Sequence, residues 1–160
     1  MIKLNEIQAK YGEYLVDEDK LKKLLVKPKP KTVWDLEEGD KYYCLDNAGN
    51  ISYIIWYENA YNLFQREIGN VFLTKEEAEF ELERKKCEAI MLKYGRRTFK
   101  INMSNFCICY NHLHENFKPA NHLYYQDQGH IYFDSDKLAQ KAIDEIGEER
   151  LKKYIFRVEK

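Results

Sequence analysis

The sequence predicts an α+β fold built from two ββ-loop-βα units, in which a mainly antiparallel sheet carries its helices on one face. The main observation is an internal echo between Gly69–Ala78 and Gly129–Ala139. Each segment reads as a turn glycine, a short strand of β-branched and aromatic residues, a hydroxyl residue that can cap a helix, and an amphipathic helix. Each also follows residues typical of a strand pair. This repeat predicts that Val71 and Ile131 occupy matching strands of one sheet.

The composition is that of one soluble globular domain. The chain has 160 residues, of which 33% are charged and 44% hydrophobic, and this balance excludes a disordered chain. A net charge of −1 gives no overall attraction to nucleic acid or to a membrane. No apolar run approaches the roughly twenty residues of a membrane span, and the charged start Met1–Glu6 does not resemble a signal peptide. The four irregularly spaced cysteines fit a reducing cytoplasm.

Residues 1–31 are predicted to form a helical N-terminal arm and a basic linker. Apolar residues recur at helical spacing over Leu4–Tyr11, and Asp17 can cap a second short helix. The proline-containing run Lys27–Lys31 reads as an extended linker. The two helices do not suit a helix-turn-helix, because their connection is long and the second helix begins with consecutive acids. We expect the arm to pack on this domain or on a partner.

Residues 32–160 are predicted to form the α+β domain, and its first unit spans about 33–95. The predicted strands are, in order, Lys41–Leu45, Ile51–Tyr57 and Val71–Leu73. A turn rich in Asn and Gly joins the first two strands, and a polar, aromatic connection precedes the third. Thr74 is predicted to cap a long helix, with Glu77 completing a capping box and Gly95 ending the helix.

The second unit spans about 98–156 and repeats this order. Its predicted strands are Thr98–Asn102, Phe106–Tyr110 and His130–Phe133. The stretch Asn111–Gln128 is predicted to be a long connection. Ser135 is predicted to cap a helix that stops at Gly147, and Glu148–Tyr154 adds one or two further helical turns.

The strongest metal candidates are Cys107, Cys109, His112 and His114, because zinc prefers cysteine and histidine ligands. On one continuous strand these side chains would point along a line, whereas a tetrahedral site needs the chain to fold back. We therefore expect no metal and no cofactor. The two cysteines would act as small buried apolar residues beside solvent-facing histidines.

No motif indicates an enzyme. A cysteine nucleophile would need an orienting group and an oxyanion site, and the sequence marks neither. The seven glycines are scattered and form no phosphate-binding loop. We therefore expect a non-catalytic protein.

The aromatic content suggests a binding function. Thirteen tyrosines, eight phenylalanines and two tryptophans exceed the needs of a core of this size, and several lie within Tyr53–Phe64. Since tyrosine and tryptophan are enriched at protein interfaces, this segment predicts an aromatic contact surface. The alternative is that alternate residues of the segment fill the core face of a hairpin.

A second feature is basic. Positive side chains follow the end of the first long helix, at Lys93, Arg96, Arg97 and Lys100. Beside stacking aromatics such as Trp34, Tyr57 or Tyr61 they could track a phosphate backbone, although helix-end electrostatics explains them equally well. The residues predicted to bind a partner are Trp56, Tyr57, Tyr61, Arg96 and Arg97.

Three stretches, Trp34–Tyr43, Gly69–Glu79 and Gly129–Arg150, carry a resemblance. Together they resemble a family of small uncharacterised proteins carried by phages and prophages of low-GC Gram-positive bacteria, and the resemblance covers most of the chain from Trp34 onward. It implies a genetic context and transfers no catalytic residue.

Small phage accessory proteins of this size commonly bind a host or phage protein, and some block bacterial immune nucleases, as anti-CRISPR proteins do. With the aromatic content and the lack of a catalytic motif, this context predicts a non-catalytic phage-type accessory protein in the cytoplasm of a host bacterial cell. We expect it to bind and modulate or inhibit a host protein such as an immune nuclease, and the step to a nuclease is an analogy from context. The alternative is an accessory factor that binds nucleic acid through the basic segments. Neither hypothesis requires a membrane, and the sequence leaves the oligomeric state open.

Overall fold

The computed structural model describes residues 4–12 and 32–158. Contacts divide the chain into two units, Met1–Lys31 and Thr32–Lys160. In the first unit, helix α1 (Leu4–Tyr11) agrees with the predicted helix. The second predicted helix and the basic linker lie outside the described residues. Within the described part of the chain, no helix is long and apolar enough to cross a membrane.

The first hairpin of the larger unit was predicted nearly residue for residue. Strand β1 (Lys41–Leu45) pairs antiparallel with β2 (Ile51–Ile55). The side chain of Asp46 accepts hydrogen bonds from the backbone N–H groups of Ala48 and Asn50, each at 2.8 Å, and so organises the turn. Strand β2 ends two residues earlier than predicted.

The aromatic segment after β2 contains a helix, α3 (Ala60–Glu67), where the sequence predicted an irregular connection. Asn59 caps this helix, because its side-chain oxygen accepts a hydrogen bond from the Asn62 N–H at 2.9 Å. The cap residue is visible in the sequence, but the short helix depends on tertiary contacts for its stability.

Helix α4 (Lys75–Tyr94) has the predicted cap and a shifted capping box. The Thr74 hydroxyl accepts a hydrogen bond from the Glu77 N–H at 3.2 Å. The Glu77 carboxylate accepts from the Leu73 N–H at 2.9 Å rather than from the cap residue itself. The two bonds still satisfy two donors at the start of the helix.

Gly95 ends α4 as predicted, but its backbone is not in the left-handed conformation that usually favours glycine at a helix end. Its backbone is extended, with φ −127°. A Cβ at this position would lie 2.8 Å from both the Tyr132 carbonyl oxygen and the Ile131 Cγ2. Glycine is therefore required by close approach of the backbone to a neighbouring segment.

The second hairpin differs from the prediction. Strand β3 (Phe106–Asn111) is confirmed, but its partner is β4 (Asn116–Asn121), which lies inside the predicted long connection. The predicted strand Thr98–Asn102 is wrong. Instead the buried side chain of Asn105 accepts from the Lys100 N–H and donates to the Lys100 carbonyl, both at 2.9 Å, which holds a loop there.

Helix α5 (Asp136–Ile146) confirms the last predicted helix, because the Ser135 hydroxyl accepts from the Leu138 N–H at 3.3 Å. Gly147 ends it with φ +85°, a conformation that favours glycine. The chain continues as α6 (Glu148–Arg150) and a π-helical segment η2 (Leu151–Phe156), which confirms further helical turns.

The prediction of one sheet with all helices on one face is wrong. The described strands form two separate antiparallel hairpins, β1–β2 and β3–β4. Val71–Leu73 and Ile131–Phe133 belong to neither sheet, and Phe72 and Phe133 make only isolated bridges to Tyr43 and Phe106. The sequence echo is therefore local: each bridging phenylalanine lies two residues before a helix cap, but the two halves do not extend one sheet.

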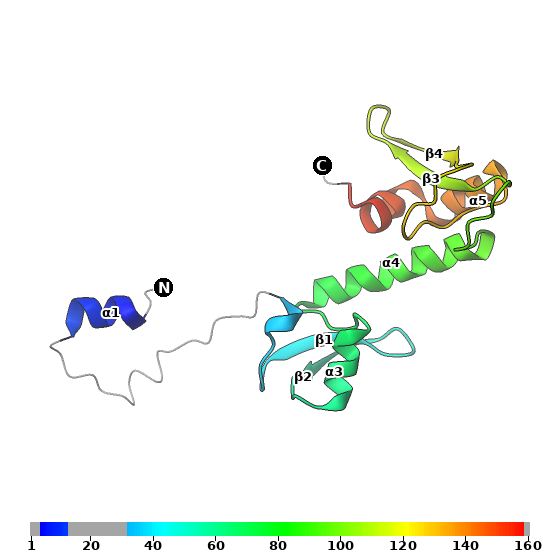
Figure 1. Cartoon of the computed structure of the whole chain (residues 1–160). Helices are drawn as coiled ribbons and strands as arrows, with labels where there is room; N and C mark the ends of the chain where they lie inside the picture. The colour runs from blue at the N-terminus through cyan, green and yellow to red at the C-terminus, as the bar shows by residue number, and fades with distance from the viewer. Residues whose placement is uncertain (1–3, 13–31, 159–160) are drawn as a thin grey trace. The chain divides into compact units, whose positions relative to one another are not determined.

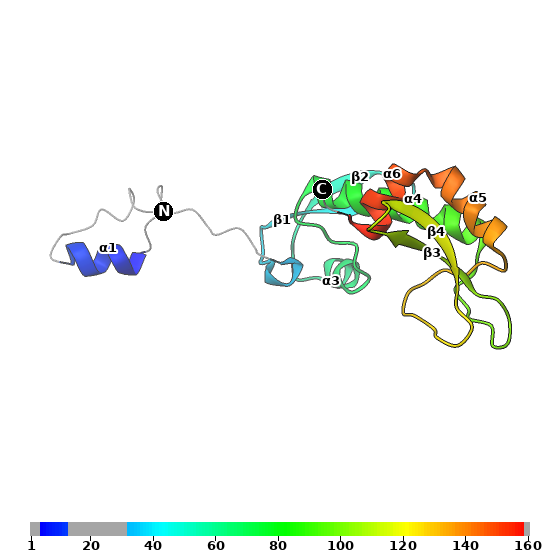
Figure 2. The ribbon, with the colours of Figure 1, turned by 90° about the horizontal axis from the view of Figure 1, so that it is seen from above.

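Helix α4 runs between the two hairpins (Figure 1), each of which contributes to its own hydrophobic cluster. Toward its start it contacts β1 and β2, whose cluster is built on Leu36, Tyr42, Cys44, Trp56 and Val71. It also packs on α5 and η2, and the second cluster contains residues of all three helical segments and of β3–β4. Figure 2 shows α3 beside the first hairpin and α5 near the opposite end of α4.

Candidate functional site

The predicted aromatic residues divide between surface and core. Tyr57 and Tyr61 are 52% and 55% exposed, as a contact surface requires. Trp56 is only 3% exposed and packs edge-on against Tyr42, with ring centroids 5.8 Å apart. The assignment of Trp56 to a binding surface is therefore corrected, because its ring belongs to the core.

Helix α3 presents apolar side chains to solvent. Tyr61, Phe64 and Ile68 follow one another at a spacing that places them on one face of a helix. They are 55%, 56% and 55% exposed. We call these three residues the α3 surface. Ile68 was not among the residues predicted from the sequence. The Asn59 cap indicates a helix that begins at residue 60, and the spacing of the three residues would then place Ile68 on the same face as Tyr61 and Phe64.

The opposite side of α3 is anchored by a buried polar residue. Asn62 is 2% exposed and its Oδ1 accepts a hydrogen bond from the Tyr42 hydroxyl at 2.7 Å. Its Nδ2 donates to the Tyr57 carbonyl at 2.9 Å. Burial, followed by the nearby Cys44 and Tyr61, raises the pKa of Tyr42 to about 12, so the hydroxyl remains a donor at neutral pH. The helix therefore turns Asn62 and Leu63 toward the core and leaves Tyr61, Phe64 and Ile68 in solvent, so that it has apolar side chains on its outer side as well.

A stacked arginine links α3 to the segment before β1. The Arg66 guanidinium lies 4.8 Å from the Trp34 ring centroid and 4.7 Å from that of Trp56. Its Nε is buried and has no hydrogen-bond partner within the described part of the chain. Trp34 is 65% exposed, so this cation–π stack fixes an aromatic ring at the surface near the end of α3.

The region around the α3 surface is acidic. Residues 32–70 contain seven Asp and Glu against two Lys and Arg, a net charge of −5. Glu58 and Glu67 lie at the two ends of α3, and both are exposed. Such a surface repels phosphate and attracts a basic partner.

The predicted basic patch is engaged within the protein. The Arg96 Nε lies 3.0 Å from Asp134 Oδ1, and its side chain is 17% exposed. Lys100 lies 3.2 Å from the same Asp134 oxygen, and Lys93 lies 2.8 Å from a Glu145 oxygen. Arg97 pairs with Glu88. The prediction that Arg96 and Arg97 bind a partner stays untested, but their charges already have acidic partners.

These pairs also perturb the acids involved. Hydrogen bonds from Arg96 and then Lys100 lower the pKa of Asp134. A hydrogen bond from Lys93, followed by one from Tyr94, lowers the pKa of Glu145. The basic residues at the end of α4 and after it therefore connect this end of the helix to Asp134, just before α5, and to Glu145, in the last turn of α5.

Comparisons with protein-family models, with curated proteins and with solved structures each found no match to this chain.

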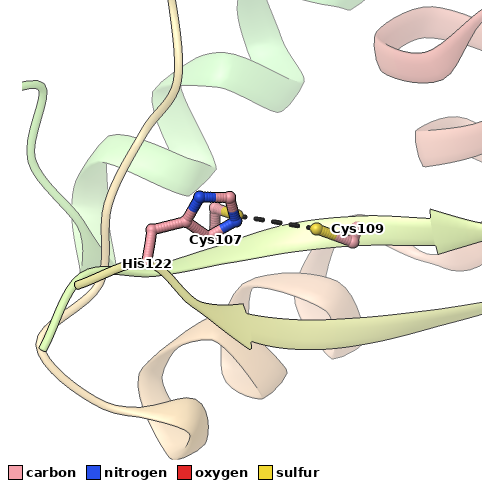
Figure 3. A group of neighbouring side chains, drawn as sticks. All are labelled: Cys107, Cys109 and His122. Atoms are coloured by element: carbon pink, nitrogen blue, oxygen red, sulfur yellow. Dashed lines mark hydrogen bonds between the residues drawn. The ribbon is translucent and has the colours of Figure 1, made fainter. Parts of the chain in front are cut away.

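The predicted metal candidates are not brought together as a set. His112 and His114 are exposed in the turn between β3 and β4, where the His112 ring contacts Tyr110. Cys107 and Cys109 do lie together, with their Sγ atoms 3.6 Å apart. A different histidine, His122, joins them, so that one ligand atom of each residue lies within 4.8 Å of the others (Figure 3).

The sequence argument against a metal was that ligands on one continuous strand point along a line. In the structure the chain does fold back, because β4 returns beside β3 and brings His122 to the two cysteines. His122 follows β4 directly. The sequence places all four histidines in the same half of the chain as Cys107 and Cys109, but it does not show that His122 is the one beside them. Burial, followed by the neighbouring Cys109, raises the pKa of Cys107 to about 12.

A cavity of about 1050 Å³ lies between the start of α4, the β3–β4 turn and the segments α6 and η2. Glu77 and Glu81 of α4 line it together with Lys152 and Arg157. It contains none of the residues predicted to bind a partner. The aromatic surface and this cavity are therefore separate features of the larger unit.

Proposed function

We propose that the protein is a non-catalytic accessory protein of phage type that binds a host protein through the α3 surface. The observation that carries this proposal is the orientation of α3, with Asn62 buried and Tyr61, Phe64 and Ile68 in solvent. A soluble protein that keeps large apolar side chains outward on an ordered helix pays a solubility cost unless a partner covers them. Aromatic residues supply most of the binding energy in many protein interfaces.

The acidic surroundings suggest the kind of partner. The net charge of −5 over residues 32–70 favours a protein with a basic surface. Nucleases hold their substrate with Lys and Arg, so their substrate-binding surfaces have the complementary charge. A bacterial immune nuclease whose substrate groove is covered by this acidic, aromatic surface fits both features, and the resemblance to phage proteins agrees with that target.

The alternative, direct binding of nucleic acid, has weaker support. Tyr57 and Tyr61 could stack on bases, but they lie in the acidic region. Lys93, Arg96, Arg97 and Lys100 all pair with acids of the same chain. This alternative requires that the protein shift DNA or RNA at low salt and lose binding steeply as salt rises.

The test uses a double variant and a matched control. Tyr61→Ser with Phe64→Ser removes two large side chains from the α3 surface, whereas Tyr125→Ser removes one that is 78% exposed outside it. Purified immune nucleases of low-GC Gram-positive hosts are assayed for cleavage with each protein. We expect the natural chain and Tyr125→Ser to inhibit at least one nuclease and the double variant to fail. Equal inhibition by all three, or a purely self-associating protein by light scattering, would contradict the proposal.

A further inference from the structure

Strand β3 places two thiols in position to share a ligand. Cys107 and Cys109 are two residues apart in a strand, so their side chains point to the same face. Their Sγ atoms are 3.6 Å apart. Two thiolates bound to one tetrahedral zinc at about 2.3 Å each would be separated by about 3.8 Å. The pair therefore already has nearly the spacing of two zinc ligands.

The chain then folds back and brings a third donor. Strand β4 pairs with β3, with Asn121 opposite Phe106, and the His122 N–H donates to the Asn105 carbonyl at 2.9 Å. This bond fixes the backbone of His122 beside the start of β3. Figure 3 shows the imidazole beside the Cys107 sulfur, with the Cys109 sulfur next along β3, and one ligand atom from each of the three residues lies within 4.8 Å of the others.

A carboxylate lies beside the second ring nitrogen of His122. Asp127 Oδ2 lies 3.3 Å from the Nδ1 of His122 and 3.5 Å from the Nδ1 of His130. Histidines that bind metals usually donate their second ring N–H to a carboxylate or carbonyl, which fixes the tautomer and the ring orientation. With the proton on Nδ1, beside Asp127, Nε2 would offer its lone pair to a metal.

We propose that Cys107, Cys109 and His122 bind a zinc ion, with Asp127 orienting the His122 imidazole. Two thiolates and an imidazole are soft and borderline donors, which select zinc over magnesium or calcium. Three protein ligands leave the fourth position to water or another small ligand. A cavity of about 400 Å³, lined in part by Cys107, Gly129 and His130, reaches one of the three proposed ligands.

The ion would tie β3 to the loop that follows β4. This loop carries Leu123, Tyr124 and Tyr125, which are 48%, 86% and 78% exposed. The residues of the loop between His122 and Asp127 are all exposed, so few packing contacts hold it. Zinc bound at His122 therefore orders the start of this loop, independently of the α3 surface.

The test measures zinc bound by the purified full chain, by elemental analysis and by competition with a chromophoric chelator. We expect one zinc per chain, and thiolate-to-cobalt charge-transfer absorption when Co²⁺ replaces it. Cys109→Ser and His122→Ala should each lower the affinity at least about 10-fold, and Asp127→Asn should lower it about 10- to 100-fold. Cys109 is chosen over Cys107 because it is only half-buried, and circular dichroism checks that each variant folds.

The paired variant His112→Ala with His114→Ala is the control, because both histidines lie in the β3–β4 turn. It should bind zinc like the natural chain. Absence of zinc at stoichiometric concentration, unchanged affinity in Cys109→Ser or His122→Ala, or a loss confined to the control would each overturn the site. A loss in His130→Ala without one in His122→Ala would overturn the choice of histidine. A mass two hydrogen atoms lower, with no zinc, would indicate an oxidised Cys107–Cys109 pair instead.

Discussion

Replacing Asn62 with Ala should destabilise the larger unit more than any other change on α3. The substitution removes the acceptor of the Tyr42 hydroxyl, which is 0% exposed and donates to Asn62 over 2.7 Å. It also removes the donor to the Tyr57 carbonyl, but that carbonyl keeps the Asn59 N–H at 2.8 Å. The main loss is therefore one unpaired buried hydroxyl, which costs about 1–3 kcal/mol.

The truncated side chain also leaves a small void, so we expect a total loss of about 2–4 kcal/mol. This is a large share of the roughly 5–15 kcal/mol that stabilises a typical domain. Urea unfolding followed by circular dichroism measures the change. Asn47→Ala, an exposed asparagine in the β1–β2 turn, is the control and should stay within about 0.5 kcal/mol of the natural chain.

A double-mutant cycle with Tyr42→Phe separates the hydrogen bond from the void. If the bond anchors α3, the two losses should fall short of additivity by about 0.5–3 kcal/mol, because the second change removes a partner that is already lost. Additive losses, or a loss below about 0.5 kcal/mol in Asn62→Ala, would refute the reasoning that a buried polar contact holds α3 with its apolar face outward.

Three further predictions concern the scaffold. Gly95→Ala should lower the free energy of unfolding by about 1–3 kcal/mol in urea titrations, because the added Cβ meets the Tyr132 carbonyl at 2.8 Å; an unchanged midpoint would contradict this. Ser135→Ala should cost about 0.5–2 kcal/mol through loss of the α5 cap, measured by thermal unfolding, while Ser135→Asp should retain most of the stability. Hydrogen bonds from Arg96 and Lys100 lower the pKa of Asp134 below its ordinary value of 3.8. The ion pairs of Asp134 therefore give their full stabilisation above pH 3.8, and this stabilisation is lost as the pH falls through the lower pKa of the folded state. Asp134→Asn should therefore show a shallower fall in stability in acid than the natural chain, and an identical pH dependence would count against the pairs with Arg96 and Lys100.

Local signals in the sequence predicted local structure well. The caps Thr74 and Ser135, the β1–β2 turn and the stop at Gly147 all depend on residues within one or two turns of the chain. Gly95 differs, because the contact that requires glycine there is with Tyr132, far away in the sequence. The pairing of β4 with β3 could not be read in the same way. Pro119 lacks a backbone donor and argues against a strand, but a two-stranded hairpin leaves each strand with a free edge where proline is tolerated.

The single-sheet prediction failed because sequence similarity between two segments does not report what lies between them. Phe72 and Phe133 both bridge to the first strand of their own hairpin, and α4 occupies the space through which a shared sheet would run. The candidate sites show the same limit. Trp56 is buried and its neighbour Tyr57 is exposed, whereas Tyr61 lies on helix α3, and tertiary packing decides which of these side chains the protein covers.

The most direct test of partner binding through α3 is site-specific photo-crosslinking. A photoreactive phenylalanine analogue at Phe64 keeps the α3 surface apolar, and the same analogue at Tyr125 is the control on another exposed aromatic. In infected or expressing Gram-positive cells, we expect a discrete adduct from position 64 and none from position 125. The adduct should contain a nucleic-acid-cleaving host protein, and Tyr61→Ser should abolish it. No adduct from position 64, or the same adducts from both positions, would contradict binding through the α3 surface.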